Sequence, residues 1–225
     1  MSTTTHVRIA AEDRRQQIVD VARELFASRG FEGTTTRELA EHAGINEALI
    51  FRHFPSKEEL YWAVLQNMID MRGTKDRLRE HVNAGLSESE TLTAVAQDIL
   101  NRSVLLTRLL FYSVLEKHEL SDRFFSTHVI AYHEILAEYI RKGIAAGRFR
   151  KMDPLLAARA FIGIFSYHFQ IQELFGGKNH QKFESKDVIQ QQVDIWLEGM
   201  KPRVVKQQPR PRRSSKLATE KAATR

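Results

Sequence analysis

The spacing of apolar residues along the chain predicts an almost entirely helical protein. Apolar positions recur every three or four residues over most of the sequence, whereas the strict alternation of a half-buried strand is rare. The stretch 10–29 is typical, because its apolar residues fall on one helical face and Gly30 follows as a suitable helix end. Those apolar residues are Ile18, Val21, Ala22, Leu25 and Phe26. We therefore expect an all-α fold.

Two short helices are predicted after this first one. Thr35 and Glu38 have the spacing of a capping box, which opens a helix that Gly44 can end in the left-handed conformation. Asn46 is suited to cap a second short helix that runs to about Phe54. Two short helices joined by a tight turn that contains glycine form a helix-turn-helix unit. The N-terminal part is thus predicted to be a three-helix domain of this kind.

Longer helices are expected in the rest of the chain. Ser56 opens a helix to about Arg72, and Ser87 caps another whose apolar stripe continues through Leu110. Further helices are expected at about 122–146, 155–175 and 186–200. The helix at 155–175 is apolar on more than one face, which predicts burial on two sides.

In a helix-turn-helix unit the second helix enters the major groove, and its N-terminal residues reach base edges. Here Ile45, Ile50 and Phe54 would face the core of the domain. The other residues of this helix would be free to face DNA, namely Glu47, Ala48, Leu49, Phe51, Arg52 and His53. Any one of them could instead be an ordinary surface residue, and Leu49 and Phe51 suit packing equally well.

Several side chains of this region have a chemical reason to contact DNA. The guanidinium of Arg52 matches guanine or a phosphate. Leu49 suits a thymine methyl group, and Glu47 could accept from the amino group of cytosine. Thr35 lies at a helix N-terminus, which favours a phosphate, and Lys57 could reach the DNA backbone from the start of the next helix.

The run from Gly30 to Leu60, GFEGTTTRELAEHAGINEALIFRHFPSKEEL, resembles the signature of the TetR family of one-component bacterial regulators. An aromatic residue after the glycine, a threonine pair, an Ala-Gly-Ile turn and a His-Phe ending agree in type and spacing. The resemblance implies DNA contacts at Thr35, Thr36, Asn46, Glu47, Ala48, Leu49, Phe51, Arg52, His53 and Lys57. Two positions depart from the family: Phe51 replaces the usual tyrosine and lacks its hydroxyl, and Ala48 replaces a frequent glycine.

The C-terminal part, from about 80 to 200, is rich in aromatic residues, which at helical spacing suit a packed core. The resemblance implies that this region also holds an effector pocket and that its last two helices dimerise as a four-helix bundle. A large apolar pocket suits a hydrophobic or aromatic effector. Candidate ligand-binding residues are Phe111, Tyr112, His128, Tyr132, Phe165 and His168. Candidate dimer contacts are Phe161, Ile164, Val193 and Trp196.

Positive charge is concentrated at the C-terminal end of the sequence. Residues 201–225 carry nine basic residues against Glu220 alone, so the rest of a chain of net charge +6 carries −2. The DNA-binding hypothesis therefore rests on local geometry and not on bulk charge. We interpret the tail as disordered, with nonspecific contacts to phosphates as the alternative. The predicted organisation is a flexible N-terminus at 1–9, a helix-turn-helix domain at 10–55, a helical effector-binding and dimerisation domain at 56–200, and the basic tail at 201–225.

Other features of the sequence narrow the class of protein. There is no cysteine, which excludes a disulfide framework and a thiolate zinc site. His128 and His133 are five residues apart and do not form the i, i+4 pair of a helical zinc site, so neither a metal nor another cofactor is predicted. No run approaches the roughly 18 apolar residues of a spanning helix. We expect a cytoplasmic protein without a membrane partner.

The leading hypothesis is a homodimeric repressor that a small apolar effector releases from a palindromic operator in double-stranded DNA. An all-helical enzyme or ligand carrier is the first alternative. The sequence has no nucleophile elbow, phosphate-binding glycine loop or HExxH motif, so we predict that the protein is not an enzyme. An architectural DNA-binding protein is the second alternative, but the charge of −2 outside the tail argues against it.

Overall fold

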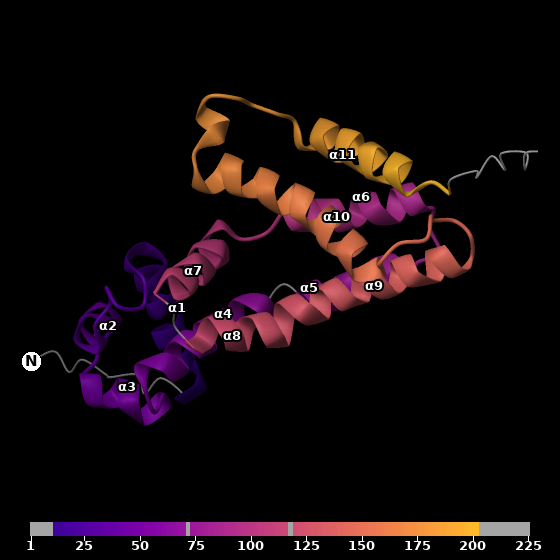
Figure 1. Cartoon of the computed structure of the whole chain (residues 1–225). Helices are drawn as coiled ribbons and strands as arrows, with labels where there is room; N and C mark the ends of the chain where they lie inside the picture. The colour runs from indigo at the N-terminus through magenta and orange to yellow at the C-terminus, as the bar shows by residue number, and fades with distance from the viewer. Residues whose placement is uncertain (1–10, 71–72, 117–118, 203–225) are drawn as a thin grey trace, which may run out of the picture.

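A computed structural model describes residues 11–70, 73–116 and 119–202. Within these ranges the chain forms helices joined by turns, and no strand is present, in agreement with the predicted all-α class. Figure 1 shows the N-terminal helices gathered at one end of the molecule and α11 near the other. The predicted flexible N-terminus at 1–9, and the basic tail from residue 203 onward, lie outside the described residues.

The N-terminal helices form the predicted three-helix unit and continue into a fourth helix. Their bounds are α1 (Ala11–Arg29), α2 (Thr36–Ala43), α3 (Glu47–His53) and α4 (Lys57–Asp70). Three aromatic rings pack together at the centre of this group. The ring of Tyr61 stands edge-on to Phe26, with centroids 4.8 Å apart, and to Phe31, with centroids 5.4 Å apart. Such edge contacts add about 0.5–1.5 kcal/mol each to the burial of the rings.

The C-terminal helices form the larger part of the molecule. They are α5 (Thr74–Asn83), α6 (Glu88–Leu100), α7 (Val104–Leu115), α8 (Glu119–Phe124), α9 (Ile130–Ala145), α10 (Pro154–Phe169) and α11 (Ser185–Met200). Short π-helical segments follow α8 at Phe125–Val129 and α10 at Gln170–Leu174, and a 3₁₀ turn spans Gly177–Asn179. Asp153 caps α10 through its side chain, and Pro154 occupies the first turn, where its missing amide hydrogen costs no helical bond.

The prediction of one helix from Ser87 through Leu110 is wrong. The helix ends at Leu100, and α7 begins at Val104 after three intervening residues. Ser103 is its N-cap, and the Ser103 hydroxyl accepts from the amide of Leu106 at 3.2 Å. The apolar spacing continues across the break, which is why periodicity alone joined the two helices. The helix α5 was also not predicted, because its sequence is mostly polar.

The predicted helix at 155–175 is also not buried on two sides within one subunit. Leu156 and Tyr167 of α10 have exposed fractions of 61% and 66%. The opposite face packs on the C-terminal core, where Phe161 lies edge-on to Trp196 with ring centroids 5.3 Å apart. One apolar face of α10 is therefore left without a cover in the single chain.

Two hydrophobic clusters divide the molecule. The C-terminal cluster contains α6, α9, α10 and α11, whereas the N-terminal cluster contains α1 to α4 and also Leu109 of α7 and Leu120 of α8. Because α4 packs in the N-terminal cluster, the domain boundary predicted at 55/56 stays a prediction. No helix in the described part of the chain is long and apolar enough to cross a membrane.

Candidate DNA interface and effector cavity

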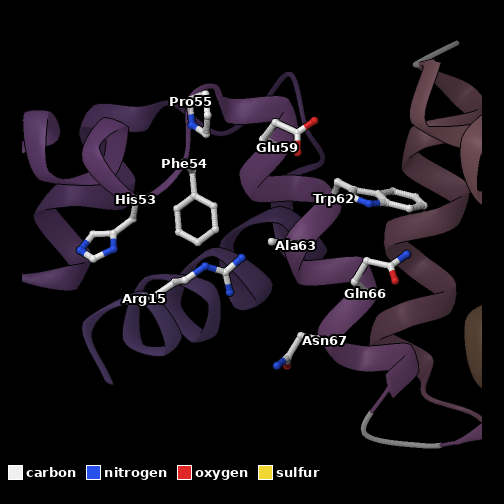
Figure 2. Close-up of a pocket in the computed structure, with 9 residues that line it drawn as sticks. All are labelled: Arg15, His53, Phe54, Pro55, Glu59, Trp62, Ala63, Gln66 and Asn67. Atoms are coloured by element: carbon white, nitrogen blue, oxygen red, sulfur yellow. The ribbon is translucent and has the colours of Figure 1, made fainter. Parts of the chain in front are cut away.

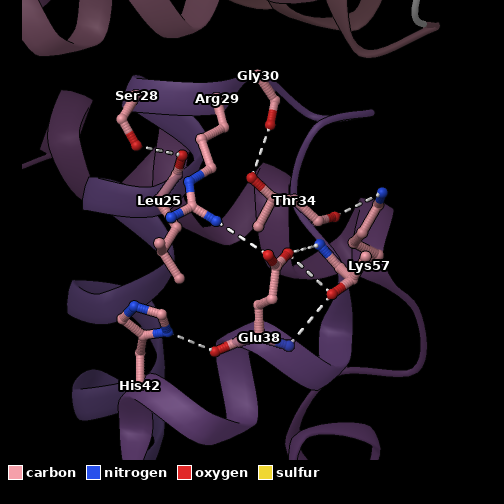
Figure 3. Close-up of polar contacts among 9 residues, drawn as sticks. Leu25, Ser28, Arg29, Gly30, Thr34, Glu38, His42 and Lys57 are labelled. Atoms are coloured by element: carbon pink, nitrogen blue, oxygen red, sulfur yellow. Dashed lines mark hydrogen bonds and ion pairs between the residues drawn. The ribbon is translucent and has the colours of Figure 1, made fainter.

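The turn between α1 and α2 is held by a network of hydrogen bonds, which Figure 3 shows. Gly30 has a φ of 77°, and its carbonyl accepts from the hydroxyl of the buried Thr34 at 2.9 Å. The ammonium of Lys57 donates to the carbonyls of Phe31 at 2.9 Å and Thr34 at 3.1 Å, and it lies 4.0 Å from the centre of the Phe31 ring. Lys57 thus fixes the turn that leads into α2. Its predicted contact with the DNA backbone stays a prediction.

Thr35 forms the predicted capping box with Glu38. The Thr35 hydroxyl donates to the Glu38 carboxylate at 2.9 Å and accepts from the Glu38 amide at 3.2 Å. The Thr35 amide donates to the same carboxylate at 3.0 Å, and Arg29 forms an ion pair with it at 2.9 Å. The hydrogen bonds from the Thr35 backbone and side chain lower the pKa of Glu38. The N-terminus of α2 is therefore fixed by contacts within the chain itself.

The helix α3 is the predicted second helix of the helix-turn-helix unit, and it begins and ends close to the predicted positions. The side chain of Asn46 caps it by accepting from the amide of Leu49 at 2.8 Å. Ile50 and Phe54 are buried, as the sequence predicts, and Ile45 packs partly buried against the same core. The residues that face outward are Asn46, Glu47, Ala48, Phe51 and Arg52, whereas Leu49 and His53 are partly buried.

Some polar side chains on the exposed face of α3 already have hydrogen-bond partners within the chain, and others do not. The hydroxyl of Thr36 donates to the carboxylate of Glu47, so these two predicted contact residues are bonded to each other. Arg52, by contrast, is exposed, and within the described residues it has no hydrogen bond or ion pair. Phe51 has an exposed fraction of 45%, which is large for an apolar ring. Arg52 and Phe51 are thus the side chains of α3 most available to a partner.

His53 lies beside an open groove rather than on the outer face of α3. Figure 2 shows this groove between α1, α3 and α4, with His53 and Arg15 near the ring of Phe54. Its volume is about 370 Å³, and the guanidinium carbon of Arg15 lies 4.8 Å from the centre of the Phe54 ring. The remaining lining residues are Pro55, Glu59, Trp62, Ala63, Gln66 and Asn67.

The middle of α7 and the residue just after its C-terminal end are bonded to the N-terminal helices. The hydroxyl of Tyr61 on α4 donates to the carbonyl of Leu109 at 2.6 Å. The carboxylate of Glu116, just after α7, accepts from the amide of Phe31 at 3.1 Å. A Cβ atom on Gly30 would lie 2.4 Å from that carboxylate, so a larger residue there would displace the Glu116 side chain. A displacement of α7 would therefore act directly on the turn between α1 and α2.

The opposite, N-terminal end of α7 borders a cavity of about 250 Å³. Of the predicted ligand-binding residues, His128 and Tyr132 line this cavity. The other four lie elsewhere: Phe165 is buried in the C-terminal core, Phe111 is exposed with a fraction of 39%, Tyr112 contacts Gly30, and His168 lies 6.0 Å from the ring of Phe183. The structure therefore supports two of the six candidates as neighbours in one site.

Sequence reasoning missed the charged residues of this cavity. Lys75, Asp98 and Arg102 line it together with hydroxyl groups and apolar side chains. Arg102 lies in the short break between α6 and α7, which the single-helix prediction had concealed. A basic residue directly before the N-cap Ser103 was the available signal. The apolar part of the lining consists of Ile69, Ile99, Leu106, Leu110, Phe124, Val129 and Ile162.

The cavity also borders α4, which packs in the N-terminal cluster. His128, on the π-helical segment after α8, has its Nε2 atom 2.9 Å from the side-chain amide nitrogen of Gln66 on α4. The centre of the His128 ring is 6.2 Å from that of Trp62 of α4 and 5.2 Å from that of Phe124 of α8. His128 thus links the lining of the cavity to α4.

The residues predicted for the dimer interface lie mostly inside the subunit. Phe161 and Val193 are fully buried, Trp196 is 7% exposed, and only Ile164 is partly accessible. The first three therefore stabilise the C-terminal core of one chain. A different stripe of α10 and α11 faces outward, consisting of Leu156, Ala160, Gly163, Tyr167, Ile195 and Gly199.

Comparisons with known proteins cover both parts of the chain. Residues 18–64 match the model of bacterial regulatory proteins of the tetR family, and residues 89–199 match the C-terminal domain of AefR-like transcriptional repressors. The chain is 38% identical over 74 residues to the transcriptional activator FasR of Mycolicibacterium smegmatis, covering 32% of this chain and 34% of that protein. It is 38% identical over 82 residues to the repressor KstR2 of Rhodococcus jostii, covering 36% and 39%. The chain thus aligns with less than half the length of these relatives.

The whole fold is also similar to that of solved structures. One is AibR in complex with isovaleryl coenzyme A and operator DNA, with a TM-score of 0.63 and 20% sequence identity over 81% of this chain and 97% of that one. At this identity the likeness concerns the fold.

Proposed function

Because this chain belongs to the TetR family of bacterial regulatory proteins, we propose that it is a homodimeric repressor that binds a palindromic operator and leaves it when a small molecule occupies the cavity. The observation that carries the proposal is the outer face of α3, where Arg52 is exposed without a partner in the described residues and Phe51 lies beside it. An arginine so placed can reach guanine or a phosphate in the major groove.

The hydrogen bonds within the chain suggest which residues of the interface contact DNA and which only hold the others in place. Arg52 and the exposed apolar residues of α3 contact base edges, and the amides at the start of α2 lie near a phosphate. The Thr36 hydroxyl holds the carboxylate of Glu47, which restricts where that negative charge can lie relative to phosphates. Lys57 acts by fixing the turn before α2.

The variant Arg52→Ala tests the proposal directly. We expect it to lose about 1–3 kcal/mol of discrimination per half-site, measured by fluorescence anisotropy on DNA from upstream of its own gene and on scrambled DNA at equal salt. Arg141→Ala is the matched control, since Arg141 pairs with Glu138 on the surface of α9, away from α3. Equal binding of wild type to both DNAs would refute operator recognition, and wild-type affinity in Arg52→Ala would refute the role of Arg52.

The dimer is proposed to form through the outward stripe of α10 and α11. Ile195 is 63% exposed, and Leu156 and Tyr167 are exposed to a similar degree. A Cβ atom on Gly163 or Gly199 would meet nothing within 4 Å in the single chain, so a second helix could approach closely there. Four helices packed in this way would form a two-fold bundle with the same patch on both subunits.

The substitution Ile195→Asp tests this interface. A buried, unpaired carboxylate on each side of the two-fold axis disfavours association, so we expect a monomer by light scattering at a concentration where wild type is a dimer. Lys142→Asp, which adds a carboxylate on the exposed surface of α9 outside this stripe, is the control. A dimeric Ile195→Asp protein with unchanged dissociation would rule out this face.

Effector coupling is proposed to run through α4 and α7 together. The cavity lining includes Ile69 of α4 and Leu106 of α7, and His128 contacts Gln66 of α4. The same α7 is bonded to the DNA-binding unit through Tyr61 and Glu116. Because half-sites one DNA turn apart require recognition helices about 34–36 Å apart, a small shift of α4 and α7 would suffice to weaken binding.

A further inference from the structure

The cavity beside α7 contains a cation whose charge is not balanced by the described residues. Arg102 is partly buried, its Nε atom donates to the carbonyl of Ile99 at 2.9 Å, and its guanidinium carbon lies 5.8 Å from the centre of the Phe169 ring. Burial lowers the pKa of Arg102, yet an arginine remains charged at neutral pH. In the described parts of the chain no carboxylate forms an ion pair with it.

The acidic residue of the lining is already paired with other groups. The carboxylate of Asp98 accepts from Arg77 at 3.1 Å and from the imidazole of His81 at 3.1 Å. Lys75 adds a second cation to the lining. The cavity therefore has an excess of positive charge, which burial makes unfavourable until an anion enters.

Neighbouring groups can complete an anion site around Arg102. Burial raises the pKa of Tyr132 to about 12, so the phenol keeps its proton at neutral pH and can donate it in a hydrogen bond. Ser103 and Thr107 line the same cavity. Burial lowers the pKa of His133, which favours the neutral imidazole there. These groups favour an acceptor-only ligand end, as a carboxylate is.

The rest of the lining is apolar and accepts a hydrocarbon group. Leu106 and Leu110 of α7, Phe124 of α8 and Ile162 of α10 contribute to it. A ligand that fills the site must therefore have one anionic end and an apolar body. The sequence alone predicted the apolar body but not the charged end.

We propose that the effector of this protein is an apolar carboxylic acid, whose carboxylate pairs with Arg102 and whose hydrocarbon part lies along Leu106, Phe124 and Ile162. This inference rests on the proposed function, because it names the chemical class of the molecule that would release the regulator. The planar guanidinium binds a carboxylate in two parallel hydrogen bonds, which a neutral amide or alcohol cannot reproduce.

The test compares acids with neutral molecules of the same shape. Hexanoate, octanoate, decanoate and benzoate are titrated into the full chain by calorimetry, each beside its primary amide. The quenching of tryptophan fluorescence gives a second readout, since Trp62 lies next to His128. We expect at least one acid to bind ten or more times more tightly than its amide. Equal binding of acid and amide, or no binding of any acid at millimolar concentration, would overturn the proposal.

Variants of Arg102 test whether this residue causes the preference for the acid over the amide. Arg102→Gln should weaken binding of the acid at least tenfold and leave the amide within about twofold, whereas Arg141→Gln on the surface of α9 should change neither. Acid binding in Arg102→Gln at wild-type strength would refute the pairing. If Arg102→Gln does not fold, the ratio of acid to amide affinity in the wild type still decides. Arg102→Lys then gives a second comparison. It keeps the positive charge but lacks the paired donors of the guanidinium, so it should retain a smaller preference for the acid.

Operator binding, measured on the same preparations without ligand, separates the two hypotheses. Wild type that binds its operator but no acid contradicts the effector class and leaves the repressor proposal standing. Wild type that binds octanoate but no operator contradicts the repressor proposal alone. Release of operator DNA by the acid and not by its amide supports both.

Discussion

The hydroxyl of Tyr61 provides a sharp test of how the DNA-binding unit is joined to the C-terminal helices. The side chain is fully buried, and its hydroxyl donates to the carbonyl of Leu109 at 2.6 Å. Burial, together with the nearby charge of Glu116, raises the pKa of Tyr61, so the hydroxyl stays protonated over the whole neutral range. The substitution Tyr61→Phe removes this one hydrogen bond and keeps the ring contacts with Phe26 and Phe31.

The expected loss of stability follows from the cost of an unmade bond. A hydrogen bond of this kind contributes about 0.5–1.5 kcal/mol net. The carbonyl of Leu109 lies within α7 and keeps its helical hydrogen bond, so no further penalty is added. We therefore expect the free energy of unfolding to fall by about 0.5–1.5 kcal/mol. At roughly 2–4 °C per kcal/mol for a chain of this size, the melting temperature should fall by about 1–6 °C.

Urea denaturation at one fixed protein concentration measures this change, since the proposed dimerisation would make apparent stability depend on concentration. Tyr112→Phe is the matched control, because the hydroxyl of Tyr112 is 3.5 Å from the carbonyl of Ser28 in an exposed position. It should cost less than about 0.5 kcal/mol. If both substitutions have the same effect, the contact between Tyr61 and Leu109 does not join the two parts as we argue.

Two further changes test other parts of the structure. Gly143→Ala should lower the free energy of unfolding by about 1–3 kcal/mol, because the new Cβ would lie 2.3 Å from the ring of Phe149; Gly199→Ala meets nothing within 4 Å in the subunit and serves as its control in thermal denaturation of monomeric Ile195→Asp protein. Glu38→Gln should reduce the dependence of the free energy of unfolding on pH in the acid range. The folded pKa of Glu38 lies below 4.5, so its contribution is present above that pH and is lost as the pH falls through the folded value. An unchanged acid slope in urea midpoints between pH 5 and roughly 3 would contradict this role.

The elements of the fold could be predicted where the deciding interactions are local. Thr35 and Asn46 each cap a helix as their positions in the sequence indicate, since a cap bonds amides only two or three residues away. The burial of Ile50 and Phe54 also follows from their helical spacing. Local signals failed at the break between α6 and α7, where the apolar spacing continued across it.

The state of individual polar side chains was decided by tertiary structure. Lys57 is charged and follows the recognition helix, which suits a contact with DNA, but the carbonyls of Phe31 and Thr34 lie within reach only once α1 and α4 have packed together. The bond between Thr36 and Glu47 likewise depends on how α2 and α3 are set relative to each other.

The sequence by itself determined the all-α class and the helix-turn-helix unit, because caps, glycine turns and helical periodicity act over a few residues. The family was indicated by the resemblance of the run from Gly30 to Leu60 to the TetR signature. Only the tertiary structure decided which apolar stripes cover each other and which stay open, so that Phe161 and Trp196 became core while Leu156 and Ile195 face outward. It also decided that Arg102 lies in a cavity, because α4, α6, α7, α9 and α10, distant in sequence, enclose it together.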